Sequence, residues 1–440
     1  MRAFSVSILM LLFIFACGDQ NKRSINELEL KMNDIAAQYV KLVLEIGLYK
    51  PDYVDAYYGP AEWKPNKADQ KEIDSTLINS LNKKTDALLN KLDALKDYQA
   101  TELETLRYRF LYKQILSIKG MIFIISGGTF PFDKEAKILY DVEAPHYNKE
   151  HFQKIIDELN KIVPGSGQLA KRLNDFKDQF IIPPDKLDTV FTVAINECRK
   201  RTLQYIQLPD EENFKVEYVK DKPWGAYNWY KGNSFSLIQV NTDLPIQIDR
   251  VIDLAAHEGY PGHHVFNALL EKNFVKEKGW IEFSVYPLFS PVSLIAEGTA
   301  NYGIQVVLPG NEQIKFEQEI LFPLAGINPT NADLYYRILN LLRGLNYAGN
   351  EAARNYLDNK WTKEETLTYQ MNYQLLSEKR AKKKLDFIKK YRSYVINYNL
   401  GEDLVKNYIE LNGGTDDYPE RRWELFEQLL SVPQTPSGLK

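Results

Sequence analysis

Apolar residues recur at intervals of three and four along most of the first half of this chain, which is the spacing of amphipathic helices. After Ser24, a residue type that caps helices, this pattern runs from Leu28 to Ile46 and predicts a long helix. The same spacing predicts further helices over residues 73–95, 103–125, 151–162 and 187–206, with Gly- and Pro-rich breakers between them. We therefore expect residues 24–210 to form an N-terminal helical region.

The pattern changes near residue 211. Residues 216–219 and 235–240 alternate and are rich in branched and aromatic side chains, which predicts two short strands, with an aromatic loop over residues 224–233 between them. Helical spacing then returns and predicts helices over residues 332–357, 364–388 and 402–411. We therefore predict a mainly α fold, a large multi-helix body with a central cleft, whose second region, residues 211–440, contains a small β-sheet.

The N-terminal residues resemble an export signal. Residues 3–16 form an apolar run that is short for a transmembrane helix but typical of a signal-peptide core. Residues 14–18 then resemble the bacterial lipobox, where the chain is cleaved before a cysteine that carries lipid. We predict a signal peptide over residues 1–16, a lipid on Cys17 and a tether over residues 17–23, with a plain secretory signal or an uncleaved anchor as the alternative. The body is then exported and anchored to an envelope membrane, facing the periplasm or the cell surface.

Charge and cysteine content exclude two classes of protein. The 55 basic and 59 acidic residues give a net charge of -4, without the basic excess that nucleic-acid binding needs, so we expect no nucleic-acid partner. The chain has two cysteines, and lipidation of Cys17 would leave Cys198 without a disulfide partner. The helical context of Cys198 predicts a buried, unreactive thiol, which argues against a cysteine protease.

Three of the five histidines fall within residues 257–264, and a glutamate follows the first of them. His257 and Glu258 are placed as in zinc hydrolases, in which a second histidine normally comes four residues after the first on the same helix face. That position is Pro261, so the strict His-Glu-x-x-His spacing is absent. A metal site here requires a different path for the second ligand.

Two neighbouring residues, His263 and His264, are candidates for that second ligand. In a straight helix His264 would lie about 10.5 Å along the axis from His257, and His263 would point to another side. Pro261 removes a helical hydrogen bond and Gly262 permits unusual dihedral angles, so we expect the chain to deform and bring one histidine back. We favour His263 slightly, and leave open that either or both of the pair bind the metal.

A third ligand is predicted on a later apolar helix. Helix spacing places Glu297 on one face with Leu294 and Asn301, where a carboxylate is costly unless it is paired or bound to metal. Two histidines and a glutamate with one open position form the usual catalytic zinc set, so we expect a single Zn2+ ion. Glu258 is then the expected general base, which takes a proton from metal-bound water as that water attacks a carbonyl. The plainer alternative is that Glu297 is only ion-paired, for example with Arg343.

These motifs resemble those of a known family. Residues 257–264 and 296–302 are similar to the His-Glu-x-x-Pro-Gly-His-His and Glu-Gly-Trp-Ala-x-Tyr motifs of the bacterial domain-of-unknown-function family 885, with Thr299 in place of the usual Trp. Residues 398–401 are similar to that family's Tyr-x-x-Gly. The family is grouped with the gluzincin-like metallopeptidases. The resemblance implies a helical metallopeptidase-like fold, zinc, and a peptide or peptide-like substrate.

A peptidase also needs a donor for the oxyanion that forms during attack. Candidates from the C-terminal helices are, in no strict order, Tyr398, Tyr394, Arg392, Tyr347 and Arg343. Tyr398 is favoured because it begins the Tyr-x-x-Gly match. The predicted strand over residues 235–240 comes just before the metal helix, so the small sheet should lie beside that helix, and an extended peptide could add to it as a further strand.

The sequence therefore predicts a zinc-dependent hydrolase, most simply a peptidase. Two alternatives stay open. One is an envelope lipoprotein with a structural or degenerate metal site and no turnover, and the other is a metal-dependent amidase or esterase that acts on a non-peptide substrate. The pattern of residues does not indicate an oligomeric state.

Overall fold

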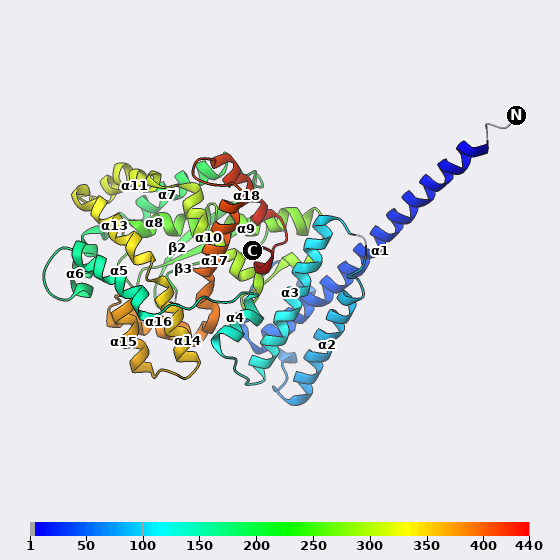
Figure 1. The fold of residues 1–440 in the computed structure, drawn as a ribbon, viewed down its shortest axis with the longest axis horizontal. Coiled ribbons are helices and arrows are strands. Elements are labelled where there is room, and N and C mark those ends of the chain that lie inside the picture. Colours follow the sequence, from blue (N-terminus) through cyan, green and yellow to red (C-terminus); the bar gives the residue numbers. More distant parts are fainter. Residues whose placement is uncertain (1–4, 99, 223, 440) are drawn as a thin grey trace.

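The computed structural model describes residues 5–98, 100–222 and 224–439, with side chains from Glu27 onwards except that of Asp69 (Figure 1). The predicted lipid site Cys17, like the signal peptide and the tether, lies outside the residues whose side chains are described. The fold is mainly α, as predicted. Among the described helices, none is both long enough and apolar enough to cross a membrane.

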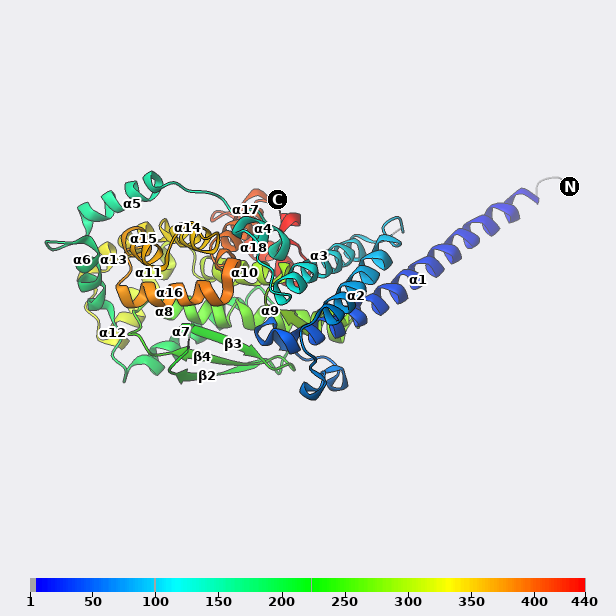
Figure 2. The ribbon, with the colours of Figure 1, turned by 90° about the horizontal axis from the view of Figure 1, so that it is seen from below.

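Three helices form one end of the molecule: α1 (Ser5–Tyr49), α2 (Ser75–Asp93) and α3 (Glu102–Ile125). They pack against one another, and both views show them side by side (Figures 1 and 2). The Asp74 carboxylate caps α2 by accepting a hydrogen bond from the Leu77 amide at 2.8 Å. Thr101 and Glu104 form a reciprocal capping box at the start of α3. Local sequence signals therefore define these helices, and the predictions for them are confirmed.

The remaining helices build the body around the predicted metal region. Their bounds are α4 (Phe132–Tyr140), α5 (Lys149–Ile162), α6 (Leu169–Lys177), α7 (Leu187–Thr202), α8 (Asp249–Leu254), α9 (His263–Leu270), α10 (Pro291–Val307), α11 (Asn311–Phe316), α12 (Phe322–Ala325), α13 (Ala332–Arg343), α14 (Asn346–Leu357), α15 (Lys363–Tyr373), α16 (Glu378–Tyr391), α17 (Leu400–Leu411) and α18 (Pro419–Ser431).

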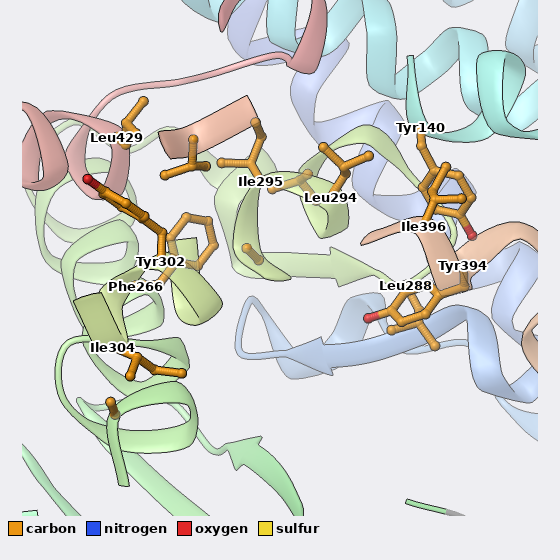
Figure 3. Packing of buried hydrophobic residues seen from close by; sticks show 14 of the residues in the cluster. Tyr140, Phe266, Leu288, Leu294, Ile295, Tyr302, Ile304, Tyr394, Ile396 and Leu429 are labelled. Carbon is orange, nitrogen blue, oxygen red and sulfur yellow. The ribbon is translucent and has the colours of Figure 1, made fainter. Parts of the chain in front are cut away.

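Helix α10 is the central helix of the body. Every residue from Pro291 to Ala300 is buried, and the helix contacts α3, α4, α9, α17 and α18. Figure 3 shows α10 side chains such as Tyr302 packed near Phe266 of α9, with Tyr140 and Tyr394 close together further along. A helix that is apolar on all sides is typical of a protein core. Glu297 therefore extends from a core helix, where its carboxylate needs a partner.

Two long predicted helices are each divided in the structure. The range 332–357 breaks at Gly344, where an added Cβ would lie 2.8 Å from the Ile155 side chain, and yields α13 and α14. The range 364–388 breaks into α15 and α16, because Ser377 caps α16 by accepting a hydrogen bond from the Arg380 amide. Apolar spacing continues across both breaks, so periodicity alone missed them.

The three-stranded sheet has the order β2 (Asn213–Val219), β4 (Phe235–Asn241), β3 (Ala226–Tyr230), with β2 parallel and β3 antiparallel to β4. It lies along one face of the molecule, against α7 and α8 (Figure 2). Residues 224–233 were predicted as a loop, and this was wrong, since they contain β3. The flanking glycines suggested a loop, whereas the aromatic residues between them favour a strand.

The position of the strands changes one prediction. Strand β4 is central and its main chain is paired on both sides, so an extended peptide cannot add along residues 235–240. Within the described residues the free edge beside the predicted metal helix belongs to β3. A second sheet, not predicted, pairs β1 (Val54–Tyr57) with β5 (Val285–Pro287) in antiparallel fashion. A single large apolar cluster contains residues from both the 24–210 and the 211–440 regions.

Candidate metal centre

The histidine-rich segment leaves the α-helix just before the motif. Helix α8 widens into the π-helix η5 (Ala255–Gly259), and the chain then becomes extended at Tyr260. The Tyr260 amide donates to the Ala255 carbonyl at 3.0 Å, and the Gly262 amide donates to the Ala256 carbonyl at 2.9 Å. Single π turns of this kind often occur at functional sites. The predicted deformation at the Pro-Gly step is therefore present.

Gly262 allows the chain to fold back on the turn that carries His257. A Cβ on Gly262 would lie 2.0 Å from the His257 carbonyl oxygen, so only glycine fits this approach without displacing the main chain. Helix α9 begins at the next residue, His263. The His257 and His263 rings consequently lie 4.7 Å apart, centre to centre, at nearly a right angle.

His257, His263 and Glu297 converge on one point. One ligand atom from each lies within 4.8 Å of the other two. The His257 Nε2 atom is 3.4 Å from Glu297 Oε2, and the His263 Nε2 atom is 3.7 Å from Glu297 Oε1. Two ligand atoms on a tetrahedral zinc ion, each about 2.1 Å from it, lie about 3.4 Å apart. Buried Glu297 Oε2 has no hydrogen-bond partner among the described residues. The donor set and its spacing therefore fit a zinc ion.

His264 lies outside this triad. It is fully buried, its Nδ1 atom is 2.9 Å from Ser236 Oγ on β4, and its Nε2 atom is 3.0 Å from Glu212 Oε2. Both ring nitrogens are therefore occupied on the far side of the segment. The option that His264 binds the metal is not supported by this placement. Glu212 also accepts hydrogen bonds from Tyr260 and Arg199, so His264 helps to fix the segment to the body.

Hydrogen bonds from neighbouring polar groups orient His257 and Glu297. The Asn301 Oδ1 atom lies 2.9 Å from His257 Nδ1, which leaves Nε2 of that ring towards the other two residues. Asn301 Nδ2 in turn donates to the Tyr398 carbonyl at 2.7 Å, and the Tyr394 hydroxyl donates to Glu297 Oε1 at 2.7 Å. Groups that hold ligands in this way strongly affect metal affinity. From the sequence, Tyr394 was predicted only as a possible oxyanion donor, and no role was predicted for Asn301.

Two glycines bring these partners to the triad. A Cβ on Gly298 of α10 would lie 2.4 Å from the Gly401 carbonyl oxygen, and one on Gly401 would lie 2.7 Å from the Leu294 carbonyl oxygen. Helices α10 and α17 therefore touch main chain to main chain beside Glu297. This contact joins the Glu297-Gly298 pair of α10 to the Tyr-x-x-Gly sequence that ends at Gly401.

Glu258 is buried beside the triad, and its pKa suits a general base. Burial and the charge of Glu297 raise the pKa of Glu258 to about 7, although the charge of His257 opposes this. A general base is most effective when its pKa is near the working pH. The Asn228 side chain on β3 donates to the Glu258 carbonyl at 2.7 Å, so the edge strand and the base are directly connected.

The triad itself is strongly coupled. Burial would lower the pKa of His257, but the Glu297 carboxylate 3.4 Å away and the charge of Glu258 dominate and raise the pKa to about 9. Burial lowers the pKa of His263 to about 4. Burial opposes the charge on Glu297, yet the two histidines keep the pKa of that carboxyl below its usual value. In the metal-free protein, therefore, a proton on His257 balances Glu297.

The candidate oxyanion donors differ in their exposure and in their hydrogen-bond partners. The Tyr398 side chain is 37% exposed overall. Its hydroxyl is enclosed, and this together with the charges of Glu297 and Glu258 raises the pKa of that hydroxyl, which stays protonated. Two other candidates, Arg392 and Tyr347, are bonded to residues outside the triad. Arg392 donates to buried Glu135 of α4 at 2.7 Å, and the Tyr347 hydroxyl donates to Asp403 of α17. Both therefore hold helices together.

Arg343 does not pair with Glu297 either. Its side chain is on the exposed face of α13, and Glu297 faces the two histidines. Cys198 is a free, fully buried cysteine, and burial raises the pKa of its thiol to about 12, which confirms the prediction of an unreactive residue.

Comparison with known proteins gives the fold and no more. No family model and no curated protein matches this chain, so the resemblance to family 885 stays a prediction. Among solved structures, a candidate lipoprotein from Colwellia psychrerythraea is similar, with 16% sequence identity and a TM-score of 0.50. The match covers 82% of this chain and 68% of that chain. At this identity, the similarity shows a shared fold.

Proposed function

We propose that this protein is a zinc-dependent peptidase. The observation that carries the proposal is the convergence of His257, His263 and Glu297 at distances that suit a tetrahedral ion, with the buried base Glu258 beside them. Zinc bound there would polarise a carbonyl group and lower the pKa of water. Three protein ligands would leave one position open on a tetrahedral ion, as in catalytic rather than structural zinc sites.

The chain supplies the remaining chemistry. Glu258 accepts the proton of the attacking water, and its raised pKa then lets it pass that proton to the leaving amine. Tyr398 is the donor that can face the oxyanion, since its hydroxyl is protonated and its side chain is accessible. Asn301 and Tyr394 keep the ligands in position.

A peptide substrate is supported by the free edge of β3. This strand pairs only with β4 among the described strands, and its Asn228 is bonded to the main chain of Glu258. An extended peptide that pairs with the outer edge of β3 would pass the metal centre. The edge strand therefore takes the role that the sequence suggested for residues 235–240.

We also propose export with a lipid on Cys17. The support comes from the sequence of residues 3–18 and from the structural neighbour, which is itself described as a candidate lipoprotein. Labelling with a radioactive fatty acid, in wild type and a Cys17→Ala variant, would test this. Label on both forms would contradict a lipid at this cysteine.

The direct test of function is Glu258→Gln in the purified protein, with Glu277→Gln as a matched control on the surface. We expect both variants and wild type to bind one zinc ion, and only Glu258→Gln to lose turnover of a mixed peptide library. Zinc without turnover in wild type would instead indicate a structural site. Turnover of esters or non-peptide amides alone would favour the second alternative.

A further inference from the structure

Asp55 is placed by an irregularity in the smaller sheet. Strands β1 and β5 pair Val54 with Pro287 and Ala56 with Tyr286, so Asp55 is an extra residue in β1 without a partner across the ladder. Such bulges turn a side chain away from the regular pattern and are frequent next to active sites. The Asp55 carboxylate accepts a hydrogen bond from the Tyr227 hydroxyl of β3, so it lies at the junction of the two sheets.

The Asp55 carboxylate has no positively charged partner among the described residues. The charge of Lys231 acts to lower the pKa of Asp55, but the Lys231 ammonium group lies over the Trp229 ring and forms no ion pair with Asp55. Burial raises the pKa of Asp55 to about 7, and the charge of Glu297 adds to this effect. A partly buried carboxylate without a cation costs stability when it is ionised. The Tyr227 bond attaches Asp55 to β3, and β3 contacts η5 and bonds through Asn228 to the Glu258 carbonyl. A carboxylate in this position, next to the candidate metal centre, therefore calls for a function.

Aromatic side chains lie next to Asp55 and next to the triad. Tyr227, which donates to Asp55, lies beside Trp229 on β3, with ring centres 4.6 Å apart and the rings tilted by 34°. At the triad, the ring centres of Tyr394 and Tyr398 lie 5.8 Å apart, and the Tyr394 hydroxyl donates to Glu297. Tyr286 of β5 pairs with Ala56, the residue after Asp55. Burial and the charges of Glu297 and Asp55 raise the pKa of its hydroxyl. Tyrosine faces attract cations, so this surrounding suits an ammonium group.

The charge balance leads to the same ligand. A zinc ion held by the triad would contribute +2, and Glu297, Glu258 and Asp55 would contribute -1 each when all three are ionised, so these groups would sum to about -1 above pH 7. Arg250, whose charge acts on Glu258, is already paired with Asp253. One additional positive charge from the substrate would neutralise the site.

We propose that Asp55, supported by Tyr227, forms a subsite that binds an ammonium group of the substrate. This inference rests on the proposed peptidase function and specifies its substrate class. The ammonium group has two sources in peptides, the free amino terminus and a lysine side chain. Binding of the amino terminus would make the protein an aminopeptidase, and binding of lysine would make it an endopeptidase with a basic preference.

The test uses binding, so that it does not depend on turnover. Zinc-loaded full-length Glu258→Gln protein is titrated calorimetrically with trialanine and N-acetyl-trialanine, and with N-acetyl peptides that contain lysine or norleucine at one position. We expect one ammonium probe to bind about tenfold or more tightly than its neutral counterpart. Adding Asp55→Asn should reduce this ratio to about one, whereas adding the control Asp52→Asn three positions earlier should preserve it.

The outcomes decide the source and the inference. A ratio that depends on the amino terminus assigns the subsite to that group, and one that depends on lysine assigns it to the side chain. Equal binding of charged and neutral probes, no binding of any probe, or a ratio that survives Asp55→Asn would overturn the inference. If wild type shows no peptide turnover, only the peptidase function is refuted, because the ratio of affinities for charged and neutral probes is measured separately. Thermal unfolding of each variant checks that it is folded.

Discussion

The cost of placing Asp55 in the site predicts an unusual stability effect. Burial raises the pKa of this carboxyl from 3.8 to about 7, so ionisation opposes folding. When the pKa of a carboxyl is higher in the folded than in the unfolded protein, its contribution to the free energy of unfolding is complete at a pH below the pKa of the unfolded state. That contribution is lost as the pH rises through the pKa of the folded state. Asn at this position does not titrate. We therefore expect Asp55→Asn to be more stable than wild type at pH 8, with the gain disappearing towards pH 4.

The size of this gain follows from the pKa. A rise from 3.8 to about 7 corresponds to at most about 4 kcal/mol above pH 7, at about 1.4 kcal/mol per pKa unit. Asp55 keeps partial solvent contact, and Asn can still accept the Tyr227 hydrogen bond, so we expect about 1–3 kcal/mol.

The measurement is urea unfolding of metal-free protein between pH 4.5 and pH 8.5, because a bound divalent ion would itself lower the pKa of Asp55. Asp52→Asn is the control, since Asp52 is less enclosed and lies near Lys390. A difference between Asp55→Asn and wild type that is constant with pH would refute the reasoning, even if the variant were more stable, because only titration of the carboxyl produces the pH dependence.

Three further predictions concern the groups around the triad. Asn301→Ala should weaken zinc binding by about 10- to 100-fold in a competition titration, because it frees the His257 ring; unchanged affinity would contradict this role. Tyr398→Phe should lower kcat by roughly a hundredfold with zinc content unchanged, and Tyr347→Phe should not, so equal rates in both would exclude Tyr398 as the donor. Gly298→Ala should cost about 1–3 kcal/mol in urea unfolding, because its Cβ would lie 2.4 Å from the Gly401 oxygen; no loss would show that the helices can separate.

The sequence predicted those parts of the site that lie close together along the chain or follow helix spacing. Glu258 follows His257 directly, and Glu297 was identified because its apolar helix makes an isolated carboxylate costly. The choice between His263 and His264 depended on the π turn and on the close approach of Gly262, which spacing in a straight helix does not show.

Long-range contacts account for most of what was missed. Asp55 belongs to a short strand far upstream, and no local pattern connects it with the histidine segment. Arg392 and Tyr347 were chosen by residue type, but their partners Glu135 and Asp403 come from other helices. The fold class followed from periodicity because helices are local structures, whereas β1 and β5 form only when distant segments meet.

Zinc content per chain tests the central claim most directly. Wild type and His264→Gln, each loaded with zinc and dialysed, should retain one ion per chain by atomic absorption, since neither ring nitrogen of His264 faces the triad. His263→Ala should lose the ion, because it removes one of the three ligands. Circular dichroism would verify that both variants are folded. Full zinc occupancy in folded His263→Ala, or no zinc in wild type, would contradict the metal centre described above.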